Sequence, residues 1–161
     1  MPGTIALPSA DFLRRLLGEL LGKEVSVRPG RTEPLDPEAP AVVGVYQTDD
    51  GAVVALCRCE LTLAAAAGAA LTLVPPSVVE EAARTGAMPE VVVDNAREIL
   101  NVAARMFNNP GTPHVRLREV RVTPGQLPAE AAGILQQPGR RADFDLQVER
   151  YGDGRMTVLT I

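Results

Sequence analysis

Three polar residues of types that can bind and orient a water molecule recur along one predicted helix. Asp94, Glu98 and Asn101 stand at positions i, i+4 and i+7, so a helix places them on one face. A carboxylate and a carboxamide therefore lie one turn apart. The carboxamide of Asn101 can both donate a hydrogen bond to water and accept one from it. Pro124 follows Asn101 after 22 intervening residues.

An ordinary solvated helix face is the alternative explanation of this stripe. The apolar residues Ile99 and Leu100 belong to a wide arc that must face the core. Acidic residues in the first half of a helix are favoured by the helix dipole without any further role. Asp94 and Glu98 are like charges one turn apart, which is mildly unfavourable. Arg97, three residues after Asp94, can relieve this repulsion.

The complete pattern, Asp-x-x-x-Glu-x-x-Asn-x22-Pro, resembles the signature of the CheC, CheX and FliY family. These proteins are phosphatases that remove phosphate from the receiver aspartate of chemotaxis response regulators. The resemblance implies that Asn101 orients the attacking water and that Glu98 pairs with a lysine of the receiver. Asp94 and Pro124 are the supporting residues of the motif. The resemblance also implies a phosphorylated CheY-like receiver as partner, with Mg²⁺ carried by that receiver and no cofactor bound by this chain.

Two arginines depart from the family pattern. Many relatives carry a small residue before the glutamate and another one turn after the asparagine, where this chain has Arg97 and Arg105. Arg105 can narrow the approach to Asn101, or it can contact the acidic rim or the phosphoryl group of a receiver. A non-catalytic module that binds a receiver domain or a signalling scaffold is therefore the second interpretation.

The composition narrows the class of protein. The 161 residues fit one domain, and 46% of them are apolar. The net charge is −4 and aromatic residues make up 3%. Both argue against a nucleic-acid partner, which is recognised by clustered basic residues and by stacking on aromatic rings. No secretory signal is visible, and the apolar run 61–76 is too short to span a bilayer. We therefore expect a cytoplasmic protein without a membrane partner.

The chain offers few ligands for a metal. Cys57 and Cys59 lie two apart in a predicted strand, and His114 is the only histidine. Half of a metal site is one interpretation of the two cysteines, but no second pair completes a four-ligand set. We expect two buried apolar thiols, an ordinary histidine and no metal site.

The order of predicted elements indicates an internal repeat. We expect helices over 10–21, 63–71, 77–86 and 89–107, and strands over 24–28, 41–47, 52–59, 115–122, 143–150 and 155–161. Segment 30–40 is expected to be a loop, and a segment that contains Pro, Gly and Gln connects the strand over 115–122 to residue 140. A helix followed by three strands thus occurs in halves 9–59 and 89–161, with helices of 63–86 between them. The CheC-like fold is similarly α+β, with two α-β-β-β repeats that form a mainly antiparallel sheet packed with helices.

Local signals mark several boundaries. Ser9 and Gly22 are the expected caps of the first helix. Ser77 and Glu80 match a capping box. Hairpin turns are expected at 48–51 and 151–154. Counting back from the helix ends places Phe12 and Arg15 of the first helix where Glu98 and Asn101 stand, so only one active helix is expected, as in CheX.

The final strand is apolar on both faces. Residues 156–161 alternate without a charge after Arg155, so this strand must be interior to a sheet, covered by helices or paired with another subunit. CheX-like proteins form dimers. We therefore predict a homodimer that leaves the helix with Glu98 and Asn101 facing solvent.

Overall fold

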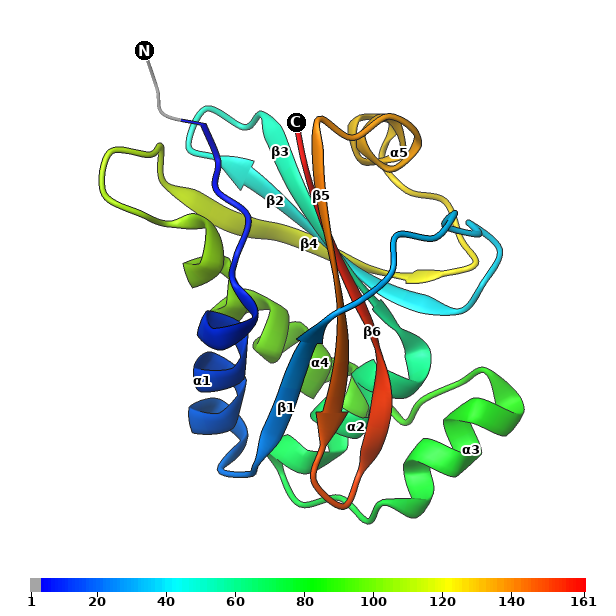
Figure 1. Cartoon of the computed structure of the whole chain (residues 1–161). Helices are drawn as coiled ribbons and strands as arrows, with labels where there is room; N and C mark the ends of the chain where they lie inside the picture. The colour runs from blue at the N-terminus through cyan, green and yellow to red at the C-terminus, as the bar shows by residue number, and fades with distance from the viewer. Residues whose placement is uncertain (1–3) are drawn as a thin grey trace.

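The computed structural model describes residues 4–161 as an α+β domain with one six-stranded sheet (Figure 1). In chain order the elements are α1 (Ala10–Leu21), β1 (Val25–Pro29), β2 (Ala41–Thr48), β3 (Val53–Glu60), α2 (Leu61–Leu71), α3 (Ser77–Thr85), α4 (Glu90–Val102), the 3₁₀ helix η1 (Ala103–Phe107), β4 (Val115–Thr123), α5 (Ala129–Gln136), β5 (Arg140–Val148) and β6 (Gly152–Thr160). All neighbouring strands are antiparallel. The expected fold class is therefore confirmed.

The strand order relates the two halves of the chain. It runs β1-β5-β6-β3-β2-β4. Exchanging β1 with β4, β2 with β5 and β3 with β6 gives the same order read from the other end. The central β3–β6 pair joins the halves, with Cys57 opposite Val158. Each half adds one helix, α1 or α4, to the same face of the sheet.

The apolar final strand is explained inside the chain. β6 lies between β5 and β3 and is buried from Met156 to Thr160. Its neighbours and the layers above and below cover both of its faces. The observation that motivated the homodimer is therefore accounted for without a second subunit, and the homodimer stays a prediction.

The main core lies between the sheet and the helices α1, α2 and α4 (Figure 1). The alanine-rich α2 is buried along nearly its whole length, because its small side chains let the neighbouring helices and strands approach closely. A second, smaller core lies on the opposite face, where Ala131 and Ile134 of α5 pack against Val43, Val45 and Leu56.

The caps of α1 are confirmed. Ser9 Oγ accepts a hydrogen bond from the backbone N–H of Phe12 at 3.1 Å, and Gly22 ends the helix with a φ of 62°. The turn between β2 and β3 is also confirmed, with Gly51 at a φ of 87°. These boundaries were predictable because each depends on a few adjacent residues.

Four sequence-based expectations were wrong. Segment 129–136, for which only a connection and no helix was expected, forms α5, because its apolar residues cover the outer face of the sheet. Ser77 lies inside α3, whose N-cap is Pro76, so the capping box does not form. The last hairpin turns at 149–151, since Val148 already pairs with Gly152. The α-helix expected to reach residue 107 ends at 102 and continues as η1.

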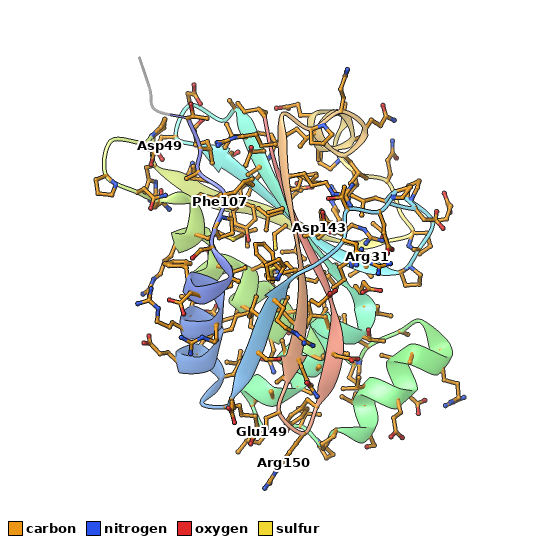
Figure 2. The ribbon with its side chains drawn as sticks, in the orientation of Figure 1. Arg31, Asp49, Phe107, Asp143, Glu149 and Arg150 are labelled. Carbon is orange, nitrogen blue, oxygen red and sulfur yellow. The ribbon has the colours of Figure 1, made fainter. Side chains whose placement is uncertain are left out.

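The segment 30–40 crosses the outer face of the sheet (Figure 1). Gly30 N–H donates to the carbonyl of Asp143 at 2.8 Å, and Arg141 donates to the carbonyl of Glu33. Figure 2 shows Asp143 in the middle of the sheet, close to the segment that carries Arg31. Burial by itself raises the pKa of Asp143, but hydrogen bonds from Arg141 and Thr157 outweigh it and hold the pKa below its usual value. The carboxylate therefore stays charged and anchors the arginine that holds the segment.

Helices α2 and α4 cross in direct backbone contact at Gly68. A Cβ added at Gly68 would lie 2.7 Å from the carbonyl oxygen of Val92 and 3.0 Å from its Cγ1. Only glycine permits this approach, because the obstructing atom belongs to the backbone of the other helix. Gly68 thereby sets the separation of the two helices.

Substitution of Gly68 tests this crossing. We expect Gly68→Ala to lower the free energy of unfolding by about 1–3 kcal/mol, because α4 must move away from α2. Gly133→Ala in α5 is the matched control, since an added Cβ there meets no atom within 4 Å. The control is expected to be neutral or stabilising by up to about 1 kcal/mol. Urea denaturation of both variants measures the difference, and equal stability of the two would contradict the crossing.

Candidate functional site

The polar stripe predicted from the sequence lies on the exposed face of α4. Asp94, Glu98 and Asn101 are all exposed, while Ala96, Ile99 and Leu100 are buried against the core. Arg97 donates to Asp94 at 3.1 Å, so these two charges form an ion pair on the surface. The structure thus brings Asp94, Glu98 and Asn101 together on one solvent-facing surface.

Glu98 and Asn101 differ from the other polar residues of this part of the helix. Asp94 pairs with Arg97, and Asn95 binds α2. Within residues 4–161, the side chains of Glu98 and Asn101 have no hydrogen-bond or ion-pair partner. Their polar atoms are therefore available to a partner molecule, one turn of helix apart.

Asn95 fixes α4 against α2. Its Nδ2 donates to the carbonyl of Gly68 and to Oγ1 of Thr72, both at 2.8 Å. The carbonyl of Gly68 is among the last four of α2, which have no partner within their own helix. A side chain of α4 therefore caps the end of α2 at the point where the two backbones touch.

Tyr46 of β2 fixes α4 near its C-terminal end. Its hydroxyl donates to the carbonyl of Leu100 at 2.7 Å in the buried core. Burial raises the pKa of Tyr46 well above its usual range, so the hydroxyl keeps its proton. Gly44 leaves room for this arrangement, because a Cβ there would lie 3.2 Å from the tyrosine ring. The ring of Phe107 packs against Tyr46 edge to face at 4.9 Å, and Figure 2 places Phe107 in the interior.

Sequence reasoning missed both of these anchoring residues. Asparagine is a poor helix former, and its place beside the exposed stripe of α4 was a signal that it bonds elsewhere. Tyr46 stood out as a lone aromatic residue among the valines of β2. Neither signal identifies the acceptor, since both acceptors are backbone carbonyls distant in the sequence.

Arg105 was expected to lie on the same α-helix as Asn101, but it does not. It is exposed in η1, the 3₁₀ segment that follows α4. Within residues 4–161 its side chain forms no ion pair or hydrogen bond, so it does not occupy the amide of Asn101. The expectation that Arg105 stacks one α-helical turn beyond Asn101 was therefore wrong.

Pro124 lies outside the helix that carries the polar stripe. It is exposed and follows directly on β4, an edge strand, after a cis peptide bond with Thr123. Thr123 Oγ1 donates to the carbonyl of Ala39 at 3.0 Å and ties this end of β4 to the start of β2. Pro124 thus belongs to the end of the edge strand.

The first helix offers no second site. Leu13, Leu16 and Leu17 of α1 are buried with the same spacing as Ala96, Ile99 and Leu100 of α4. This alignment places Arg15 and Gly18 where α4 has Glu98 and Asn101. It differs by three residues, about one turn, from the alignment by helix ends, which gives Phe12 and Arg15. Neither alignment gives a carboxylate with a carboxamide.

Other chemistry-bearing groups do not belong to the exposed stripe of α4. Cys57 and Cys59 are buried free thiols, and their mutual hydrogen bond together with burial raises the pKa of Cys57. His114 is exposed, with Nδ1 3.3 Å from the carboxylate of Asp49. Residues 4–161 contain no cluster of three or more residues that could hold a metal ion. In the same range, no helix combines the length and apolarity needed to cross a membrane.

A small apolar cavity lies in the core beneath α4. It measures about 30 Å³ and is lined by side chains such as Leu17, Leu63 and Ile99. Glu98 and Asn101 do not line it. The candidate site is therefore an exposed helical surface suited to a macromolecular partner, which can bring its own reactive group to Asn101.

Replacing each of the two asparagines of α4 tests which of their side chains stabilises the fold. We expect Asn95→Ala to lower the free energy of unfolding by about 1–2 kcal/mol, because it leaves the carbonyl of Gly68 without its donor. Asn101→Ala, on the same helix, is expected to change stability by less than about 0.5 kcal/mol. Thermal and urea unfolding of both variants measure this contrast, and a larger loss in Asn101→Ala would show that its side chain serves the fold.

Comparison with known proteins places the fold. No family model matches the sequence, and the search of curated proteins finds no relative. Among solved structures, the middle domain of FliM from H. pylori matches with a TM-score of 0.65 and 9% identity, over 94% of this chain and 84% of that one. The FliM middle domain from Vibro alginolyticus matches with a TM-score of 0.60 and 12% identity, over 94% and 87%. FliY from Thermotoga maritima matches with a TM-score of 0.56 and 11% identity, over 94% and 89%.

These matches extend over nearly the whole described chain, although the sequences are almost unrelated. They agree with the antiparallel six-stranded sheet and the helices on its face. The chain therefore has the fold of the CheC, CheX and FliY family.

Proposed function

We propose that this protein is a phosphatase that hydrolyses the aspartyl phosphate of a response-regulator receiver domain. The observation that carries the proposal is the state of two side chains on α4. Glu98 and Asn101 are exposed and unpartnered within residues 4–161, whereas their polar neighbours Asp94, Asn95 and Arg97 are engaged inside the chain. Together with the spaced motif and the fold, this supports a surface built to enter another protein's active site.

The reaction requires little chemistry from this chain. An aspartyl phosphate is a reactive acyl phosphate, and its hydrolysis needs a water placed in line with phosphorus. The water oxygen bonds to phosphorus, the bond from phosphorus to the carboxylate oxygen breaks, and free aspartate and inorganic phosphate result. Positioning and electrostatics dominate phosphoryl transfer of this kind.

Asn101 suits the positioning role. Its carboxamide is neutral, so it does not repel the phosphoryl group, and its oxygen and nitrogen can hold a water in one orientation. The water-orienting glutamine of GTPases acts in a comparable way. Asn101 does not need to act as a general base.

Glu98 is proposed to dock the helix. A carboxylate one turn before Asn101 can pair with a lysine beside the receiver's phosphoryl aspartate, which fixes the helix along its axis. Mg²⁺ belongs to the receiver in this proposal, and this chain contributes no cofactor or metal. Asp94 and Arg97 form the neighbouring ion pair, while Pro124 shapes the end of the edge strand. Such a target implies a cytoplasmic location.

Hydrolysis of phosphorylated receivers tests the proposal directly. Receiver domains from the same genome are phosphorylated with acetyl phosphate, and phosphate loss is followed with and without this protein. We expect acceleration that falls by roughly 10²–10⁴-fold in Asn101→Ala, because a positioned group is lost. Gln136→Ala replaces an exposed carboxamide of α5 on the opposite face of the sheet and is the matched control.

Two outcomes would contradict the phosphatase. One is the absence of acceleration with every receiver of the genome. The other is acceleration that persists unchanged in Asn101→Ala. If the acceleration falls as much in Gln136→Ala as in Asn101→Ala, the loss cannot be assigned to the exposed face of α4.

A non-catalytic binding module is the second candidate. The FliM middle domains have higher TM-scores than FliY, and one H. pylori FliM structure is a complex with FliG. In this case α4 and its surroundings bind a receiver or scaffold without hydrolysis. Arg97 and Arg105 favour this role, because two exposed guanidinium groups can bind acidic partners.

Binding measurements separate the two candidates. Receivers activated with beryllofluoride, a stable mimic of the phosphoryl group, are titrated with the protein by calorimetry. For the binding module we expect affinity that drops about tenfold or more in Glu98→Ala and persists in Asn101→Ala, with no hydrolysis in any variant. Glu80→Ala removes an exposed carboxylate of α3 as the charge-matched control. Equal affinity of Glu98→Ala and the control would exclude docking through α4.

A further inference from the structure

The α-helix that carries Glu98 and Asn101 changes its type directly after these residues. α4 keeps its α-helical form through Val102, and the N–H of Ala103 donates to the carbonyl of Ile99. The next carbonyl is that of Leu100, which a continuing α-helix would pair with the N–H of Ala104. The carbonyl of Leu100 instead accepts a hydrogen bond from the hydroxyl of Tyr46, and the chain continues as the 3₁₀ helix η1.

This change of helix type moves Arg105 around the axis. An α-helix turns about 100° per residue and a 3₁₀ helix about 120°. Arg105 would lie about 40° from Asn101 if the α-helix continued, so that both would share one stripe. Three 3₁₀ steps bring the separation to about 100°. The amide of Asn101 therefore faces solvent without a guanidinium above it.

We propose that Tyr46 is a positioning residue of the site, whose hydroxyl ends the α-helix after Asn101 and thereby keeps Arg105 away from the Asn101 amide. A side chain that inserts into the ladder of helical hydrogen bonds is a known cause of such local changes. The consequence for hydrolysis rests on the proposed phosphatase function. The consequence for the conformation of 103–107 does not depend on it.

The surroundings of Tyr46 support a dedicated donor. The side chain is fully buried, and a buried hydroxyl needs a partner. Gly44 and the ring of Phe107 hold the ring in place. The raised pKa keeps the hydroxyl protonated, so it always has a hydrogen to donate to the carbonyl of Leu100.

The conformational part is tested with Tyr46→Phe, which keeps the ring and removes the donor. We expect the carbonyl of Leu100 to accept from the N–H of Ala104 in this variant, so that the α-helix extends toward residue 107. NMR detects this as a scalar coupling across the new hydrogen bond and as α-helical backbone shifts for 103–107. Tyr151→Phe, at the only other tyrosine, is the control and is expected to leave these signals unchanged. Unchanged signals in Tyr46→Phe would overturn the proposal.

A measurement on the unsubstituted protein covers the case in which the variant does not fold. The hydroxyl proton of Tyr46 is expected to exchange slowly with water and to give a separate NMR signal close to the amide protons of 101–104. A rapidly exchanging hydroxyl would show that the hydrogen bond to Leu100 does not persist, and the proposal would fail.

The functional part is tested by a double-mutant cycle with Arg105→Ala. We expect Tyr46→Phe to slow receiver dephosphorylation by roughly 10–100-fold when Arg105 is present. In the Arg105→Ala background the same change is expected to cost less than about threefold, because no guanidinium can reach Asn101. An equal loss in both backgrounds would mean that Tyr46 supports only the fold and would overturn the positioning role.

The two failures are distinguishable. If the unsubstituted protein dephosphorylates no receiver, the proposed phosphatase fails, and NMR alone decides whether Tyr46 sets the helix type. If the protein is active and the cycle shows no coupling between positions 46 and 105, the phosphatase stands and the role of Tyr46 fails.

Discussion

The candidate site depends on a general constraint of helices, which is that the last four carbonyls of each α-helix need partners from elsewhere. Two such carbonyls decide the position of α4. The carbonyl of Gly68 at the end of α2 accepts from Asn95, and the carbonyl of Leu100 near the end of α4 accepts from Tyr46. Each bond comes from a different structural element. Together they hold the helix that carries Glu98 and Asn101 at its middle and near its C-terminal end.

The internal symmetry of the sheet makes the difference between the halves informative. α1 and α4 occupy related places on one face of the sheet, yet only α4 exposes a carboxylate next to a carboxamide. α1 carries arginines that pair with Asp11 and ends at Gly22 by its own capping motif. Its end is therefore satisfied locally, whereas the anchoring bonds of α4 come from α2 and β2. One half supplies the surface, and the other half with the linking helices supplies its support.

Much of this arrangement could be predicted from the sequence, because it depends on local signals. The caps of α1 and the turn at Gly51 each follow from a few residues. The apolar faces of β6 left its placement open between the interior of the sheet, a cover of helices and a second subunit. The exposure of Glu98 and Asn101 followed from the spacing of the apolar residues around them. The partners of Asn95 and Tyr46 could not be predicted, because both are backbone carbonyls. Every residue has a backbone carbonyl, so the sequence does not identify which one accepts the hydrogen bond. The helix α5 was not predicted, because its apolar residues are buried by packing against the outer face of the sheet, which is a contact between distant parts of the chain.

The central place of β6 has a consequence for the speed of folding. Without β6 the strand order would separate into the β1–β5 pair and the β3-β2-β4 group. The β1–β5 and β3–β6 pairs join residues about a hundred or more positions apart in the chain. Closing such long loops carries an entropic cost before the contacts form, so domains dominated by distant strand pairs fold slowly. We therefore expect the complete sheet to assemble late, and the surface of α4 to reach its final form only after both halves have met.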